Sequence, residues 1–322
     1  MKVRSSWRRS EYLGYFYNTA MTLTAIILIL ISAFTHVGWN LLCKREHPSS
    51  AFFLLVNTLG TLCLIPALIL FGSAIPTFPT SVWLLLIATG IFQTIYILGL
   101  ANAYQRGDLS ILYPIARSSP VIVVIIVTLF FDRADQVSAQ CIWGIALVAV
   151  GMFILPMKHL SNFHIDNYLN ASVLFALMAA FATAGYSIID DEALRFLRDT
   201  PALPIAGWQA TILYAFFEGL ITSLWLGIWV LFQKRGRILM WEILKTRASR
   251  ALLAGAGMAV AYTLVLISLA FVSNVSYVVT FRQISIPLGT IFGVLLLKEP
   301  GYTPKYLGVA VIFTGLVLVG TG

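Results

Sequence analysis

Residues 82–104 read VWLLLIATGIFQTIYILGLANAY and contain no charged side chain. A helix needs about 20 mostly apolar residues to cross the hydrocarbon core of a bilayer, so this stretch is long enough to span it. Its apolar residues form a continuous run instead of alternating with polar ones, which favours a helix over a strand of a membrane barrel. The stretch therefore predicts a transmembrane helix.

The rest of the chain has the same character. Of its 322 residues, 59% are hydrophobic and 11% are charged, whereas a soluble domain carries about 25% charged residues. A water-soluble protein of this size could not bury so much apolar surface in one core. We predict an all-α integral membrane protein with ten transmembrane helices, at Met21–Cys43, Ala51–Phe71, Val82–Tyr104, Leu109–Phe131, Ala139–Pro156, Leu169–Ile189, Ala206–Phe232, Ala251–Val272, Val275–Leu297 and Pro304–Val319.

The chain also contains an internal repeat. Residues 96–155 and 262–319 share one order of features: a tight break, a helix with an arginine and a proline, a charged break, and a helix with two glycines. The matched pairs are Arg117 with Arg282, Pro120 with Pro287, Gly144 with Gly308 and Gly151 with Gly315. Because five helices are an odd number, the second copy enters the membrane from the opposite side. We predict two inverted five-helix repeats, at residues 21–157 and 168–320.

Residues 1–20 form an N-terminal tail before the first repeat. Its basic residues precede an apolar run, as in a signal peptide, but the run from Met21 is too long and is followed by no small-residue cleavage site. The alternative is that Met21 is the true start of the protein. The formal charge of +8 comes from short loops and this tail, which is typical of proteins beside anionic lipid and does not indicate a nucleic-acid partner.

The second copy carries a family signature. It reads RQISIP at residues 282–287, LLLKEP at 295–300 and LGVA at 307–310. This resembles the repeat of the drug/metabolite transporter (DMT) superfamily, EamA-type, in which one helix ends with Glu and a Gly-rich last helix follows. The first copy departs from the pattern, with DRAD at residues 132–135 where Leu-Gly-Glu is usual. The opening SAFTHVGWN at residues 32–40 is similar to one branch of these permeases, some of which are linked to phosphonate use.

Two signals disagree on the orientation in the membrane. With ten spans both termini lie on one side, and the loops on the other side hold more Lys and Arg, which favours termini outside. The family resemblance implies termini inside. A reporter fused after Gly322 and active on only one side of the membrane would distinguish the two.

Arg117 and Arg282 are the leading candidates for a substrate site. A charge at the bilayer centre costs roughly 2.5–3.5 kcal/mol on insertion scales, so a retained one has a function or a partner. An inverted repeat places matched positions around a pseudo-two-fold axis near the midplane, where two guanidiniums could hold an anionic group bidentately. We predict a substrate with a phosphate, phosphonate or carboxylate. The alternative is that each arginine snorkels to an interface or binds a nearby carbonyl.

Other polar residues inside the predicted spans are further candidates. Glu218 is the only acidic residue well inside a span, and we predict that it couples transport to protons or else pairs with an arginine. His36, Trp39 and Asn40 share one helix face, which either lines a cavity or holds helices together. We add to the substrate site Tyr96, Tyr262 and Gln283. Further polar residues line the pathway or bridge helices, namely Asn57, Gln93, Asn102, Tyr186 and Gln209.

These features predict a secondary transporter, working by alternating access, of a small anionic metabolite. The chain has no phosphate-binding loop and no long soluble segment, which argues against ATP-driven transport by this chain. The alternatives are an intramembrane lipid-modifying enzyme and a non-transporting scaffold; a polar cavity holding both arginines would favour the transporter. We expect a multi-pass monomer or homodimer of a bacterial plasma membrane, in contact with lipid and substrate, without enzymatic activity, nucleic acid, cofactor or metal.

Overall fold

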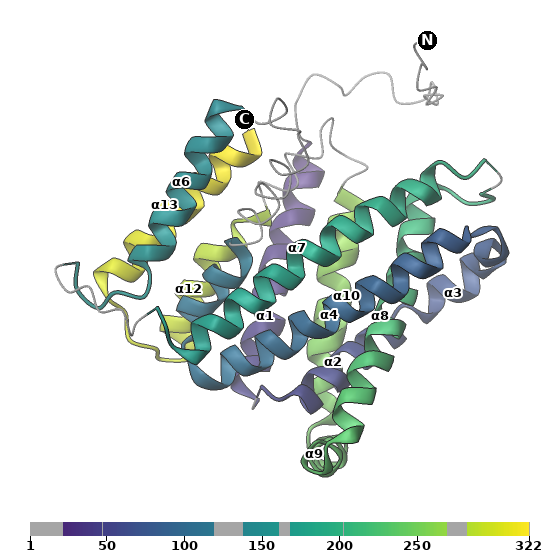
Figure 1. Ribbon diagram of the computed structural model, residues 1–322, viewed down its shortest axis with the longest axis horizontal. Coiled ribbons are helices and arrows are strands. Elements are labelled where there is room, and N and C mark those ends of the chain that lie inside the picture. Colours follow the sequence, from purple (N-terminus) through teal and green to yellow (C-terminus); the bar gives the residue numbers. More distant parts are fainter. Residues whose placement is uncertain are drawn as a thin grey trace.

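The protein is described by a computed structural model at residues 22–46, 48–118, 138–160, 168–201, 203–268 and 282–321 (Figure 1). These residues are almost entirely helical, and no strand occurs among them. The predicted all-α class is therefore confirmed for this part of the chain. The tail at residues 1–20, the charged break at 132–135, Pro120 and the start of the ninth predicted span lie outside the described residues.

Among the described residues, six helical segments are long and apolar enough to cross a membrane. They are α1 (Leu23–Arg45), α2 (Ser50–Leu62) with α3 (Ile65–Phe71) and the 3₁₀ helix η2 (Gly72–Thr77), α4 (Thr80–Arg106), α7 (Ala171–Arg198), α8 (Gly207–Phe232) and α10 (Ala248–Ser268). Shorter apolar helices are α6 (Ala139–Ile154), α12 (Ser285–Leu296) and α13 (Thr303–Thr321), and residues 109–118 are also helical. The arrangement of ten spans in two inverted repeats stays a prediction.

The second predicted span is broken. Helix α2 ends at Leu62, and α3 begins at Ile65, directly before Pro66. Proline has no backbone N–H to donate, and it disfavours helical backbone in the residue before it. The chain therefore restarts its helix there instead of continuing straight to Phe71.

Two segments predicted to be breaks are helical. Helix α7 continues through Asp190 to Arg198, because the sequence from 187 to 199 contains no Gly or Pro and is rich in helix-forming Leu, Ala, Glu and Arg. Residues Lys234–Thr246 form α9, where Leu239, Met240 and Leu244 pack on the core. Apolar residues at this spacing build one helix face, although basic residues surround them.

Three helix pairs organise the bundle: α4 packs along α7, α1 along α10, and α6 along α13 (Figure 1). The last pair packs closely, because glycine faces backbone at both ends of the contact. A Cβ on Gly144 would lie 2.7 Å from the carbonyl oxygen of Gly315, and a Cβ on Gly151 would lie 2.7 Å from that of Gly308. Small residues allow such close approach of helices in membranes.

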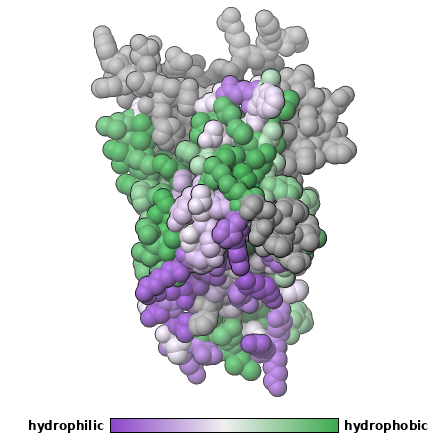
Figure 2. All heavy atoms as spheres, turned by 90° about the vertical axis from the view of Figure 1, so that its left-hand side faces the viewer, coloured by the Kyte–Doolittle hydropathy of each residue, from purple (hydrophilic) through white to green (hydrophobic). Residues whose placement is uncertain are grey.

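The two ends of the molecule differ in polarity. The loops after α1, α4 and α6, together with α9, lie at the lower end in Figure 1, and the C-terminus lies at the upper end. On the face shown in Figure 2, hydrophilic residues gather at the lower end, and hydrophobic residues cover much of the part above. Exposed apolar side chains of α6 and α13 include Trp143, Phe153 and Leu307, which suits contact with lipid.

Candidate functional site

A polar cavity of about 620 Å³ lies among the helices. This is within the usual size range of small-molecule sites, about 300–1,000 Å³. Its walls come from α1, α2, α4, α7, α8 and α10, from the helical segment 109–118, and from residues at and just before the start of α12. All nine residues predicted from the sequence line it: His36, Trp39, Asn40, Tyr96, Arg117, Glu218, Tyr262, Arg282 and Gln283.

The two arginines share one region of this cavity. Arg117 and Arg282 lie close enough to interact electrostatically with each other. His36 lies close enough to interact with both of them. Within the described residues, no carboxylate oxygen lies within 4.0 Å of either guanidinium. The predicted pairing of Glu218 with an arginine is therefore not seen in the described part of the chain.

Five buried polar atoms that line the cavity have no hydrogen-bond partner within the part of the chain that the structure describes. They are His36 Nε2, the Tyr113 hydroxyl, Arg117 Nε, Gln283 Oε1 and Ser285 Oγ, and all five residues line the cavity. The Tyr113 hydroxyl faces Ser285 and Arg117 without a hydrogen bond of normal geometry. Unpaired buried polar groups are rare because each costs about 1–3 kcal/mol. Three of these atoms, on Tyr113, Arg117 and Ser285, lie near one another.

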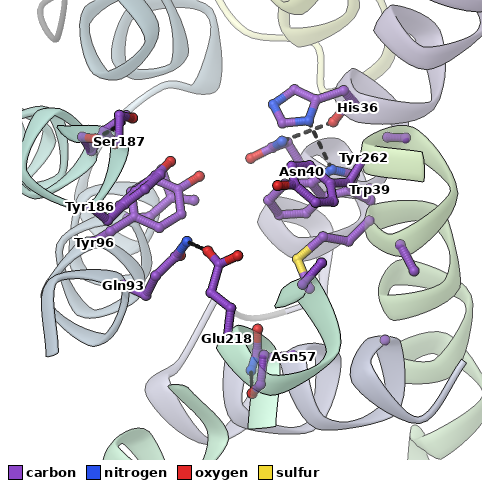
Figure 3. A pocket seen from close by; sticks show the side chains of 18 of the residues that line it. His36, Trp39, Asn40, Asn57, Gln93, Tyr96, Tyr186, Ser187, Glu218 and Tyr262 are labelled. Carbon is purple, nitrogen blue, oxygen red and sulfur yellow. Dashed lines mark hydrogen bonds between the residues drawn. The ribbon is translucent and has the colours of Figure 1, made fainter. Parts of the chain in front are cut away.

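One wall is the polar face of α1 (Figure 3). Trp39 Nε1 donates to His36 Nδ1 at 3.2 Å, and Asn40 Nδ2 donates to the His36 carbonyl at 2.8 Å. The Tyr104 hydroxyl donates to Asn40 Oδ1 at 2.9 Å. These bonds fix the ring of His36 and leave its second nitrogen toward the cavity, so this face both lines the cavity and binds a neighbouring helix.

The opposite wall carries aromatic rings and an acid. The rings of Tyr96 on α4 and Tyr186 on α7 meet edge to face, with centroids 5.8 Å apart. Gln93, one turn before Tyr96, donates to the Glu218 carboxylate (Figure 3). Tyr262 stands across the space, beside the α1 face.

A second acid lies in this cavity, which corrects the prediction that Glu218 is the only one inside a span. Asp190 was expected in a loop, but α7 continues past it and places it in the cavity lining. Its Oδ1 accepts a hydrogen bond from the Tyr214 hydroxyl at 2.7 Å, and its carboxyl group lies near that of Glu218. The sequence signal for it is the absence of a helix breaker between Tyr186 and Asp199.

Some residues do not follow the sequence expectation. Asn102 and Gln209 do not line the cavity: Asn102 bonds within α4, and Gln209 caps the start of α8. Tyr113 and Ser285 were not predicted, although Ser285 lies three residues after Arg282 and Tyr113 four residues before Arg117. Residues at these spacings share a helix face, so the arginine positions could have pointed to both.

Comparison with known proteins relates part of the chain to a family of membrane transporters. The model of the EamA-like transporter family matches residues 23–157. The family lies within the drug/metabolite transporter superfamily, and the resemblance inferred from the sequence is confirmed. The chain is a multi-pass membrane protein with an EamA-like transporter segment.

A solved structure shares the fold along nearly the whole chain. One crystal structure of a protein aligns over 92% of this chain and 96% of its own, with a TM-score of 0.57 and 16% identity. At that identity the likeness concerns the fold alone. No curated protein matches the sequence.

Proposed function

We propose that this protein is a secondary transporter that carries a small anionic metabolite across the membrane by alternating access. The observation that supports this proposal is the pair Arg117 and Arg282, which share one cavity and have no carboxylate partner among the described residues. Keeping two unneutralised positive charges close together inside a membrane is costly. A ligand that brings negative charge relieves this cost.

The guanidinium group favours particular anions. Its planar fork of N–H donors matches the oxygens of carboxylate and phosphate, with two parallel hydrogen bonds to each. The unpaired donor and acceptor atoms nearby, from His36, Tyr113 and Ser285, can complete the ligand's hydrogen bonds. The proposed substrate therefore carries a phosphate, phosphonate or carboxylate group.

The helix contacts support the two inverted repeats that alternating access needs. In the repeat, α1 corresponds to α7 and α4 to α10, so a pseudo-two-fold axis exchanges the α4–α7 pair with the α10–α1 pair, and both pairs exist. The same axis exchanges the Gly144–Gly315 contact with the Gly308–Gly151 contact, and both are close. These exchanges agree with two five-helix bundles that rock around the site.

The alternatives have less support. A scaffold has no use for a cavity of about 620 Å³ with both arginines in its lining. An enzyme gains some support, because the structure brings His36 and Glu218 into one cavity although they are far apart in sequence. However, Nδ1 of His36 accepts from Trp39 instead of donating to a carboxylate that would orient a general base. Glu218 stays our candidate for proton coupling, since it is buried and bonded to neutral Gln93.

Anion binding by the purified chain tests the proposal. Inorganic phosphate, methylphosphonate and propionate are titrated while the melting temperature is followed, and the best ligand is then used for uptake into proteoliposomes. We expect Arg117→Leu and Arg282→Leu each to abolish stabilisation and uptake. Arg195→Leu, which removes an exposed arginine outside the cavity, is the matched control. Unchanged binding and uptake in both cavity variants would contradict the proposal.

A further inference from the structure

The cavity is lined by acidic as well as basic side chains. Asp191 is exposed and lies 4.0 Å from Arg198. Glu218 and Asp190 line the same space as Arg117 and Arg282, yet no ion pair joins the two sets in the described part of the chain. We propose that the substrate is a small zwitterion whose cationic amine binds at Glu218 and Asp190 while its anionic group binds at the arginines. This inference rests on the proposed transport function and narrows its substrate class.

The acids are held as acceptors by neutral donors. Gln93 donates to Glu218, and the Tyr214 hydroxyl donates to Asp190 at 2.7 Å. No Lys or Arg nitrogen of the described residues lies within 4.0 Å of either carboxylate. A carboxylate has about four lone-pair positions, so one neutral donor leaves room for others. An ammonium, with three N–H donors and a positive charge, fits between two such groups.

A separate observation marks the acidic end as a place for a ligand. Thr222 is 1% exposed, and no described residue provides a hydrogen-bond partner for its hydroxyl. It lines the cavity four residues after Glu218 on α8, so both side chains lie on one face of that helix. A buried hydroxyl without a partner beside a carboxylate provides a further acceptor for an N–H group.

Aromatic side chains line the same cavity. Tyr262 lies near enough to Glu218, Asp190 and Arg282 to interact electrostatically with all three. Tyr96 and Tyr186 form the wall next to Gln93 and Glu218 (Figure 3). Aromatic faces attract ammonium groups and also pack against an apolar backbone of a substrate.

The balance of charge also favours a zwitterion. An anion without an amine neutralises the arginines but meets the negative charge of two carboxylates in a poorly solvated space. A zwitterion adds no net charge and gives each end of the cavity a partner of opposite sign. Because leaving a buried charged group unpaired is far more costly than leaving a neutral one unpaired, the amine should add to the affinity.

Matched ligand pairs test this inference on the purified full-length chain. β-Alanine is compared with propionate, and aminomethylphosphonate with methylphosphonate, by calorimetry at one pH. We expect the amine-bearing member of at least one pair to bind about tenfold tighter or more. We expect Glu218→Gln to remove this advantage by weakening the amine-bearing ligand, whereas the amine-free ligand should bind equally well or tighter because a repelling carboxylate is lost. Glu192→Gln, at an exposed carboxylate outside the cavity, should leave both affinities unchanged.

The failures can be told apart. Equal affinity within both pairs overturns the zwitterion but leaves anion transport standing, whereas no binding of any probe overturns both. If Glu218→Gln weakens the binding of both ligands of a pair equally, the inference is overturned as well. That result would mean that Glu218 has a structural or proton-carrying role and does not bind the amine. If Glu218→Gln does not fold, Asp190→Asn is used instead, with the same selective loss expected and the same equal weakening as the contrary result.

Discussion

The lower end of the molecule and the central cavity both hold buried or half-buried charged groups, but among the described residues the arginines of the cavity lack the partners that the groups at the lower end have. There, Glu46 accepts from Arg247 at 3.2 Å and from Arg250. The Glu299 carboxylate accepts from the backbone N–H groups of Leu109 and Ser110 at 2.7 and 2.8 Å. In the cavity, Arg117 and Arg282 have no carboxylate partner among the described residues.

Lys305 shows the same contrast from the cationic side. It is 0% exposed, and its ammonium donates to Ser110 Oγ and to the Pro300 carbonyl, both at 2.7 Å, with Asp108 at 3.6 Å. All three of its donors thus have an acceptor or an opposite charge. A buried charge with a partner holds two segments of the chain together. A buried charge without a partner destabilises the fold, but it can bind a ligand of opposite charge. The two regions should therefore respond to substitution in opposite ways.

The largest effect is expected at the arginines. Arg117→Leu or Arg282→Leu should weaken anion binding by about 2–5 kcal/mol, because the ligand's charge would be buried without its partner. The same change removes an unneutralised charge from the protein interior. We therefore expect the melting temperature without ligand to stay the same or rise. A fall of several degrees in both variants would show that the arginines hold the fold together instead.

The opposite response is expected at Glu299. Glu299→Ala leaves the N–H groups of Leu109 and Ser110 without their acceptor at the start of a helical segment. Each unsatisfied buried donor costs about 1–3 kcal/mol, so stability should fall by about 2–4 kcal/mol. Ligand affinity of the folded fraction should be unchanged. Glu299→Gln keeps one amide oxygen and should lose less, and thermal unfolding of the three proteins gives the comparison.

The contact between α6 and α13 tests a smaller, uncharged effect. In Gly151→Ala the new Cβ would lie 2.6 Å from the Ile312 side chain and 2.7 Å from the Gly308 carbonyl oxygen. The helices must separate, at a cost of about 1–3 kcal/mol. Gly38→Ala in α1 meets nothing within 4 Å and should be neutral or slightly stabilising. Equal melting temperatures for the two variants would contradict the close packing.

The smallest effect is expected at the exposed pair of Arg195 and Glu192. Their side chains are 57% and 38% exposed, and they are joined by one contact of 2.5 Å within α7. Exposed pairs gain little because water screens them and the long side chains lose freedom. Glu192→Gln should leave the melting temperature unchanged within error. A clear loss would mean that charge on this face matters beyond the pair.

Polar residues inside apolar runs predicted many of the residues that line the cavity, but they did not predict all of them. A polar residue in a long apolar run is costly in lipid, so Arg117, Glu218 and His36 could be singled out without coordinates. Asp190 was placed wrongly in a loop, because a charge near the end of a hydrophobic run is normally taken as the end of the span. Only the contacts between α7, α8 and α4 bring Asp190 near Glu218 and make its position polar instead of lipidic.

By itself, the sequence determined that the chain is helical and spans a membrane. Its apolar runs are long and continuous, and in lipid such runs satisfy their backbone hydrogen bonds as helices. It also determined which charges are out of place there. The tertiary structure alone decided which charges find partners: Glu299 meets two backbone N–H groups from residues 190 and 189 positions earlier, while the cavity arginines meet none of the described acids. Pairing depends on contacts between distant segments, and residue type and local spacing do not specify these contacts.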